Sequence, residues 1–143
     1  NSVINGDGEE KKKLENLIKL KDLENRVFLI GPTNNVYKYM KHASLFILPS
    51  LWEEVGFVIV EAALSNLFII SSDCPNGPSE FLDNGKSGIL FKSNIPGELK
   101  KSLNFYFENK NELEIKKIKT KKNSLQYTRF RHFLTLEKIL QNF

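Results

Sequence analysis

Residue types that could carry chemistry concentrate in one segment, "SLWEEVGFVIVEAALSN", which spans residues 50–66. It holds two carboxylates eight positions apart: Glu53 in a loop-like setting and Glu61 inside an apolar run. The pattern around Glu61 predicts a helix over 56–64 that is apolar on every side and therefore buried. Because a buried carboxylate without partners is costly, Glu61 must be satisfied by another group.

The chemistry that fits these residues is the binding of a phosphorylated sugar carrier. A helix that begins at Gly56 or Phe57 places Glu61 about one turn in, and its side chain then leans toward the helix N-terminus and the mouth of a cleft. Helix N-termini attract phosphate, and Gly56 allows close approach of the backbone. We therefore expect a diphosphate at the amides near 55–57 and two vicinal hydroxyls at Glu61. We expect hydroxyls of a further group at Glu53.

Structural roles compete with this interpretation. Glu61 could pair with a lysine, arginine or tyrosine in the core. Glu53 and Glu54 precede a helix, where acidic residues also act as caps. The sequence leaves these alternatives open.

Elements that could position the segment follow from the alternation of short apolar runs with helical patterns. Runs such as "VFLI", "LFIL" and "LFII" are continuously apolar, as expected for parallel strands covered on both faces. The alternation predicts a Rossmann-like three-layer α/β/α fold with a mostly parallel sheet and right-handed crossovers. We expect strands at 2–5, 26–31, 44–50, 67–72 and 88–91, and helices at 9–23, 35–43 and 56–64. A short helix is expected within 76–85, followed by helices over 96–143 with breaks near 109–111 and 123–128.

Several apolar side chains are expected to face a core. In the first helix these are Leu14, Leu17, Ile18 and Leu20. In the terminal helices they are the phenylalanines at 105, 107, 130, 133 and 143. Ligands of open α/β sheets bind beyond the carboxyl ends of the strands, which directs attention to the loops at 6–8, 31–35, 49–56 and 72–78.

Composition is that of one globular domain covering residues 1–143, with 41% hydrophobic and 27% charged residues. The single Cys74 excludes an internal disulfide and fits a reducing compartment, so we expect a cytoplasmic protein. The net charge is +4, with basic clusters after Leu99. These clusters have two interpretations. They are solvated helix faces, or they attract the protein to the anionic inner face of the cytoplasmic membrane. No recognition motif points to nucleic acid.

The quoted segment resembles the E-x7-E region of retaining nucleotide-sugar glycosyltransferases with the GT-B fold, of the group 1 or family 4 class. The stretches "INGDGEEKKKLENL", "RVFLIG", "ASLFILPS" and "DCPNGPSEFLDNGKSGILF" resemble other motifs of that family, in the same order. The resemblance covers about residues 2–95. The stretch "DCPNGPSEFL" is most similar to the subgroup that builds bacterial surface polysaccharides.

This resemblance implies the donor-binding half of a two-domain enzyme. Such an enzyme transfers a sugar from a UDP- or GDP-sugar to a glycan or lipid-linked acceptor, with retention and without a metal or other cofactor. UDP with an N-acetylhexosamine is the expected donor. The resemblance implies that Glu61 binds the donor ribose and that Glu53 contacts the transferred sugar or assists at the reacting centre. Backbone amides near Glu54, Val55, Gly56 and Phe57 would bind phosphate and sugar. The loop from Gly31 to Val36 would lie against the base, and Gly6 would lie at the cleft.

Two departures from the family pattern matter. Where the family has Gly and Phe directly after the first Glu, this chain has Glu54 and Val55, and Gly56–Phe57 come later. A carboxylate at Glu54 would repel a diphosphate unless it points away. The family's basic residues that grip the diphosphate, and its N-terminal acceptor-binding domain, are not in this sequence. We therefore expect a fragment that binds donor weakly, does not turn over by itself and self-associates through exposed apolar surface.

Two other functions remain as alternatives. One is a non-catalytic nucleotide-binding or assembly module. The other is a sugar-nucleotide epimerase of the same fold, although such enzymes do not usually show the E-x7-E spacing. Loss of nucleotide binding on replacing Glu61 would favour the transferase, and a folded chain that binds no nucleotide would favour the assembly module.

Overall fold

The computed structural model describes residues 1–54 and 56–141. The chain divides into two compact units, Asn1–His42 and Ala43–Phe143, and each is described by itself. The single domain expected from the length stays a prediction. No helix in the described part of the chain combines the length and apolar character needed to cross a bilayer.

The first unit is a parallel strand pair with its crossover helix. Ser2 of the first strand pairs with Val27 of the second, and the register shifts between Ile4 and Asn5, so that Asn5 faces Gly31. All the predicted elements of this part of the chain are confirmed, with bounds shortened by a few residues. They are β1 (Ser2–Asn5), α1 (Lys11–Leu20), β2 (Val27–Gly31) and α2 (Tyr37–Met40).

The prediction that the leucines of α1 face a core is wrong. Leu14, Leu17 and Leu20 are exposed, and only Ile18 is half-buried. The reason is size, because a unit of two strands and two short helices has little apolar surface against which a helix can pack.

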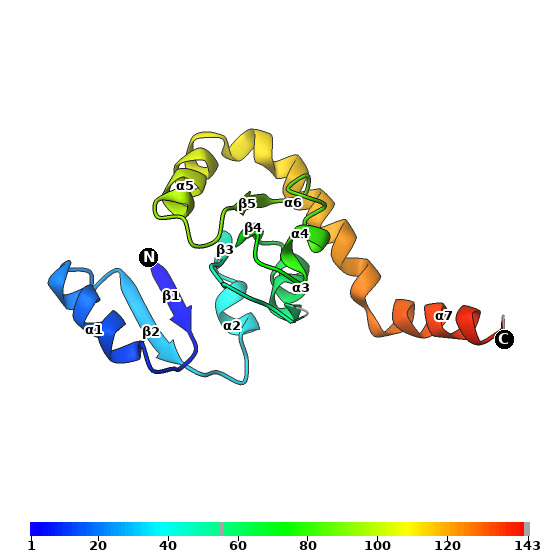
Figure 1. The fold of residues 1–143 in the computed structure, drawn as a ribbon, viewed down its shortest axis with the longest axis horizontal. Helices are drawn as coiled ribbons and strands as arrows, with labels where there is room; N and C mark the ends of the chain where they lie inside the picture. Colours follow the sequence, from blue (N-terminus) through cyan, green and yellow to red (C-terminus); the bar gives the residue numbers. More distant parts are fainter. Residues whose placement is uncertain (55, 142–143) are drawn as a thin grey trace. The chain divides into compact units, whose positions relative to one another are not determined.

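The second unit carries a three-stranded parallel sheet with β4 at its centre (Figure 1). Every residue of β4 is buried, which confirms the interpretation of its continuous apolar run. The elements are β3 (Leu45–Leu48), α3 (Phe57–Leu64), β4 (Phe68–Ser72), α4 (Pro78–Phe81), β5 (Ile89–Phe91), α5 (Glu98–Glu108), α6 (Lys110–Ser124), the 3-10 turn η1 (Leu125–Tyr127) and α7 (Arg129–Leu140).

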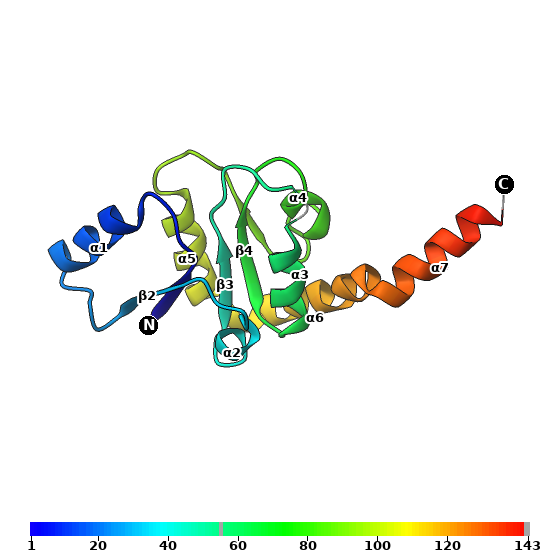
Figure 2. The same cartoon turned by 90° about the horizontal axis from the view of Figure 1, so that it is seen from below.

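Helices cover both faces of this sheet, as the predicted three-layer fold requires. On one face Phe68 and Ile70 form a cluster with Phe91, Tyr106 of α5 and Leu113 of α6. The rings of Phe68 and Tyr106 lie 4.9 Å apart. The other face receives α3, which contacts both β3 and β4. Figure 2 shows α3 and α5 on opposite sides of these strands.

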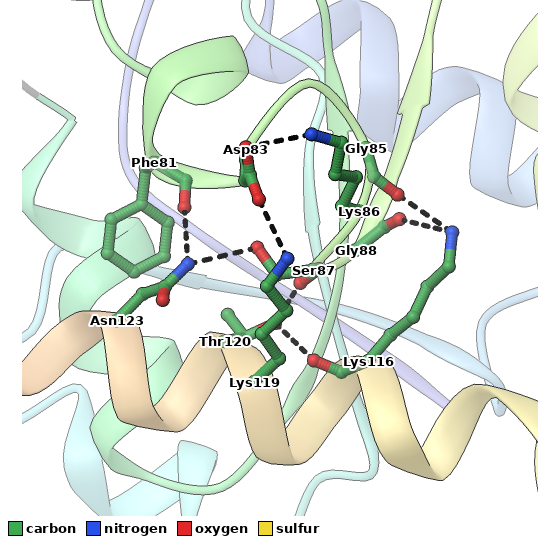
Figure 3. Close-up of polar contacts among 10 residues, drawn as sticks. All are labelled: Phe81, Asp83, Gly85, Lys86, Ser87, Gly88, Lys116, Lys119, Thr120 and Asn123. Atoms are coloured by element: carbon green, nitrogen blue, oxygen red, sulfur yellow. Dashed lines mark hydrogen bonds and ion pairs between the residues drawn. The ribbon is translucent and has the colours of Figure 1, made fainter.

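Polar side chains of α6 hold the loop that joins α4 to β5 (Figure 3). Lys116 Nζ donates to the carbonyl oxygens of Gly85 at 2.7 Å and Gly88 at 3.4 Å. One turn on, Lys119 Nζ lies 2.7 Å from Oδ2 of Asp83 and lowers the pKa of that carboxyl.

Two further side chains complete this arrangement, which we name the α6 clamp and define as Lys116, Lys119, Thr120 and Asn123. Thr120 Oγ1 donates to the carbonyl of Ser87 as well as to its own helix, and Thr120 is 1% exposed. Asn123 Nδ2 donates to Ser87 Oγ at 3.3 Å and to the carbonyl of Phe81 at 3.5 Å. The clamp therefore fixes both ends of the loop to one helix.

The phenylalanines of the terminal helices were predicted to pack those helices against a core, and this prediction is wrong. Phe105, Phe107, Phe130 and Phe133 are all exposed, and Phe143 lies outside the described residues. Tyr106 and Leu113 fill the core in their place. The prediction was wrong because it counted aromatic residues without assigning them to a face of their helices.

Candidate functional site

The carboxyl ends of β3, β4 and β5 are joined by hydrogen bonds between the loops that follow them. The buried hydroxyl of Ser72, the last residue of β4, donates to the carbonyl of Ser50 in the β3–α3 loop. The amide of Asp73 donates to the carbonyl of Phe91 at 2.8 Å, which ties the β4 loop to β5. This edge of the sheet is where ligands bind in open α/β folds.

Asp73 links the β4 and β5 loops with its side chain as well. Its Oδ2 lies 2.9 Å from Lys92 Nζ, and its Oδ1 accepts a 2.9 Å hydrogen bond from the amide of Ser93. The Lys92 ammonium, followed by the Ser93 amide, lowers the pKa of the Asp73 carboxyl below its ordinary value.

Glu53 is half-buried and rests against the turn that precedes α3. Its Oε1 accepts a short hydrogen bond from the hydroxyl of Ser50. A methyl group added at Gly56 would lie 3.8 Å from Oε2, so the carboxylate faces this glycine. Within the described residues Oε2 has no hydrogen-bond partner.

Gly56 begins α3 in the left-handed region, with φ 61° and ψ 41°. Only glycine adopts this conformation routinely, which accounts for its place directly before the helix. The helix then starts at Phe57, as predicted. Gly77, with φ 134°, precedes α4 in the same way. Two helix N-termini therefore follow β3 and β4.

Glu61 is half-buried, and across residues 1–54 and 56–141 its carboxylate makes no hydrogen bond and no ion pair. The competing structural role, in which Glu61 pairs with a lysine, arginine or tyrosine of the core, is thus not seen there. The expectation that α3 is buried on every side is wrong, because Phe57 and Leu64 are exposed. These two residues and Glu61 have the spacing of one helix face, so Glu61 lies on the outward stripe of an otherwise buried helix.

The other predicted residues of this segment are less constrained. Glu54 is exposed, and so is Phe57, at 63%. Gly56 is buried. Val55 lies outside the described residues, so its predicted role stays a prediction.

The predicted residues of the first unit lie at the ends of its two strands. Gly6 follows β1 with φ 136°, and its amide donates to the carbonyl of Gly31, the last residue of β2, at 3.2 Å. Val36 is half-buried and precedes α2. The structure brings Gly6 and Gly31 together within this unit.

Two hollows on the protein surface lie away from the strand ends. One runs along α7, lined by Phe133, Leu136 and Leu140, and one lies at the α5–α6 junction around Asn109. Groups of three or more His, Cys, Asp or Glu side chains that could hold a metal ion are absent from the described part of the chain.

Sequence reasoning overlooked three functional candidates: Ser50, Ser72 and Asp73. Each lies in or directly after the last residues of a strand. The signal for Asp73 was available, since "LFIISSD" places a carboxylate at the carboxyl end of a buried strand. The Ser-x-x-Glu spacing of Ser50 and Glu53 was available too, although that spacing is usual for a helix cap.

Comparison with known proteins places this geometry among glycosyltransferases. A family model described as "Glycosyl transferases group 1" matches residues 1–124. An uncharacterised glycosyltransferase of Methanocaldococcus jannaschii is 45% identical over 80 residues, which cover 56% of this chain and 20% of that protein. The poly(ribitol-phosphate) alpha-N-acetylglucosaminyltransferase of Staphylococcus aureus is 33% identical over 90 residues, which cover 63% of this chain and 18% of that protein.

Solved structures show the same fold. HepE of Anabaena, in complex with UDP, matches with a TM-score of 0.81 and 25% identity, over 98% of this chain and 39% of that chain. TarM matches with a TM-score of 0.78 and 28% identity, over 97% of this chain and 28% of that chain. The chain spans 20% and 18% of the lengths of the two curated relatives above.

Proposed function

The chain belongs to the group 1 glycosyl transferases, and from this premise we propose that it forms the donor-binding part of a sugar transferase. The donor is a nucleoside diphosphate sugar, and the acceptor is a glycan or a lipid-linked sugar of a surface polysaccharide. The name of one relative supports a polymeric acceptor, since it describes transfer of N-acetylglucosamine to poly(ribitol-phosphate). The structural neighbour HepE, which was solved in complex with UDP, supports a uridine nucleotide.

One observation carries the proposal, namely the Glu61 carboxylate. It is half-buried and has no protein partner in the described residues. It lies four residues after the start of α3, about 6 Å along the helix axis. A carboxylate in that place can accept hydrogen bonds from both hydroxyls of a ribose, which would supply partners that residues 1–54 and 56–141 do not.

The same loop supplies groups for the rest of the donor. The first turn of α3 has no side-chain cap, although the amide of Ile59 donates to the carbonyl of Gly56 at 2.9 Å. Amides at a helix N-terminus bind phosphate oxygens. Glu53 stands against this turn and would meet the transferred sugar. In this proposal the helix N-termini after β3 and β4 stabilise the leaving diphosphate, and transfer proceeds with retention and without a metal ion.

Roles for the first unit complete the proposal. Gly6 and Gly31 meet at the ends of β1 and β2, and the loop from Gly31 to Val36 would lie against the nucleotide base. A second, acceptor-binding domain would be needed for turnover, so this chain alone would bind the donor without transferring the sugar.

Calorimetric titration of the 143-residue chain with UDP, UDP-N-acetylglucosamine and GDP tests the proposal. A neutral amide at Glu61→Gln loses charge-assisted hydrogen bonds, so nucleotide affinity should fall about tenfold or more. Glu108→Gln, at an exposed position at the end of α5, is the matched control and should bind like the parent. A folded chain that binds none of the three ligands, or a Glu61→Gln variant that binds as tightly as the parent, would refute the proposal.

A further inference from the structure

Two serine hydroxyls, one on β4 and one in the β3–α3 loop, make successive hydrogen bonds that lead from the sheet to Glu53. Ser72 Oγ, on the central strand, donates to the main-chain carbonyl of Ser50. Ser50 Oγ donates in turn to Oε1 of Glu53. Ser72 is fully buried and Ser50 is half-buried, so the chain runs from the core toward the surface.

The two bonds have different effects on the loop. The first fixes the backbone of Ser50 against β4, which is buried along its whole length. The second fixes a side chain, since a glutamate in a loop otherwise samples many rotamers. Together they connect the Glu53 carboxylate to β4, the central strand of the sheet, which is buried along its whole length.

The second bond also makes the two carboxylate oxygens of Glu53 different from each other. Oε1 is occupied by Ser50, whereas Oε2 faces Gly56 and the start of α3 and has no partner among the described residues. A carboxylate can accept on both oxygens, so Oε2 keeps its full capacity for a ligand hydroxyl.

We infer that Ser50 is a positioning residue for donor recognition. Its hydrogen bond holds the Glu53 carboxylate so that Oε2 faces the sugar, and Ser72 anchors Ser50 to β4. The inference rests on the proposed donor-binding function. It adds a specific consequence: Ser50 should matter for the sugar part of the donor and little for the nucleotide part.

A merely structural explanation competes with this one. Ser-x-x-Glu is the spacing of a capping box, in which the serine hydroxyl accepts from a backbone amide. Here the hydroxyl donates to the glutamate side chain, and α3 has no side-chain cap hydrogen bond. The bond therefore serves the carboxylate and not the helix end.

Side-chain NMR tests the positioning without any ligand. Three-bond couplings of Glu53 should report one dominant χ1 rotamer in the parent chain and averaged couplings in Ser50→Ala. Ser50→Thr keeps a hydroxyl and should restore the parent couplings. Equal couplings in the parent and Ser50→Ala would overturn the inference whether or not the chain binds nucleotide.

Ligand titration tests the consequence for the sugar. The ratio of the Kd for UDP to the Kd for UDP-N-acetylglucosamine measures what the sugar adds. In Ser50→Ala this ratio should fall by about tenfold, the lower end of the range for a hydrogen bond to a charged group, and the Kd for UDP should change less than twofold. A ratio that stays at the parent value overturns the inference. If the parent chain binds neither ligand, the donor proposal fails and the couplings alone decide the role of Ser50.

Ser72 and its neighbour provide a matched pair. Ser71 is equally buried, but its hydroxyl donates to the carbonyls of Leu48 and Ser72 and does not reach the loop of Glu53. Ser72→Ala should average the Glu53 couplings, and Ser71→Ala should leave them as in the parent. The same effect from both variants would show general loosening of β4 and would overturn the anchoring role.

Discussion

The α6 clamp makes a quantitative prediction about stability through Thr120. Replacing Thr120 with valine keeps the shape of the side chain and removes its hydroxyl, which donates to the carbonyl of Ser87. Thr120 and Ser87 are 1% and 0% exposed, so water cannot readily replace the lost donor.

The expected cost follows from this burial. A neutral hydrogen bond contributes about 1 kcal/mol, and a buried acceptor left without a partner costs about 1–3 kcal/mol. The added methyl group of valine offsets part of the loss by burying apolar surface. We therefore expect the free energy of unfolding to fall by about 1–2 kcal/mol.

Urea denaturation followed by the fluorescence of Trp52 measures this change. Trp52 is the only tryptophan and lies in the second unit, so its signal reports the unit that contains the clamp. With a slope of about 2 kcal/mol/M, the midpoint should move down by about 0.5–1 M. Far-ultraviolet circular dichroism should give the same shift if this unit unfolds in one step.

Thr135→Val is the matched control. The hydroxyl of Thr135 donates to the carbonyl four residues before it, at 2.9 Å, as that of Thr120 does at 2.8 Å. Thr135 is exposed and makes no tertiary bond through this hydroxyl in the described chain, so its replacement should change the free energy of unfolding by less than about 0.5 kcal/mol. Equal effects of the two substitutions would refute the assignment of stability to the bond with Ser87.

Two other outcomes test the packing and electrostatics around β4. In an NMR titration, the Asp73 carboxyl should have its midpoint below the ordinary value of an aspartate, and Lys92→Met should raise that midpoint. Because the folded-state pKa is lowered, this contact stabilises the fold above the unfolded-state pKa, and its contribution is lost as the pH falls through the folded-state pKa. An ordinary midpoint in the parent would contradict the pairing. Gly88→Ala should destabilise the chain by about 1–3 kcal/mol in thermal or urea unfolding, because the new Cβ would lie 2.8 Å from Leu82 Cδ2 and 3.0 Å from a backbone oxygen of β4. Gly8→Ala, where nothing lies within 4 Å, should be neutral or slightly stabilising, and a similar loss at both glycines would contradict the packing argument.

The order and type of the elements were predictable from the sequence because local patterns specify them. The run "LFIISS" is apolar and β-branched over the length of one strand, and β4 forms there with both faces buried. Gly56 favours a helix boundary at Phe57, because glycine is unfavourable inside a helix and readily adopts the left-handed conformation that the chain has there.

Burial was less predictable, because it depends on partners that a local pattern does not name. Leu17 and Phe130 belong to helices with apolar faces, and both are exposed in the structure. The segment around Glu61 contains only apolar neighbours, yet an eight-residue helix still has an outward stripe, on which Glu61 lies. The hydrogen bond from Ser72 to the carbonyl of Ser50 could not be predicted, because it joins residues 22 positions apart and no sequence spacing encodes that contact. The bond from Ser50 to Glu53 is local, and its Ser-x-x-Glu spacing is visible in the sequence.

The α6 clamp has a consequence for the evolution of this chain. Most of its bonds to the α4–β5 loop end on main-chain oxygens, those of Phe81, Gly85, Ser87 and Gly88. Every residue type carries such an oxygen, so these bonds by themselves do not fix the residue types of the loop. Packing fixes some of them instead, because Leu82 and Ser87 are fully buried and a Cβ at Gly88 would collide with Leu82. The helix has no such freedom in its bonds, because only particular side chains can donate. Related sequences should therefore keep hydrogen-bond donors at the helix positions that reach the loop.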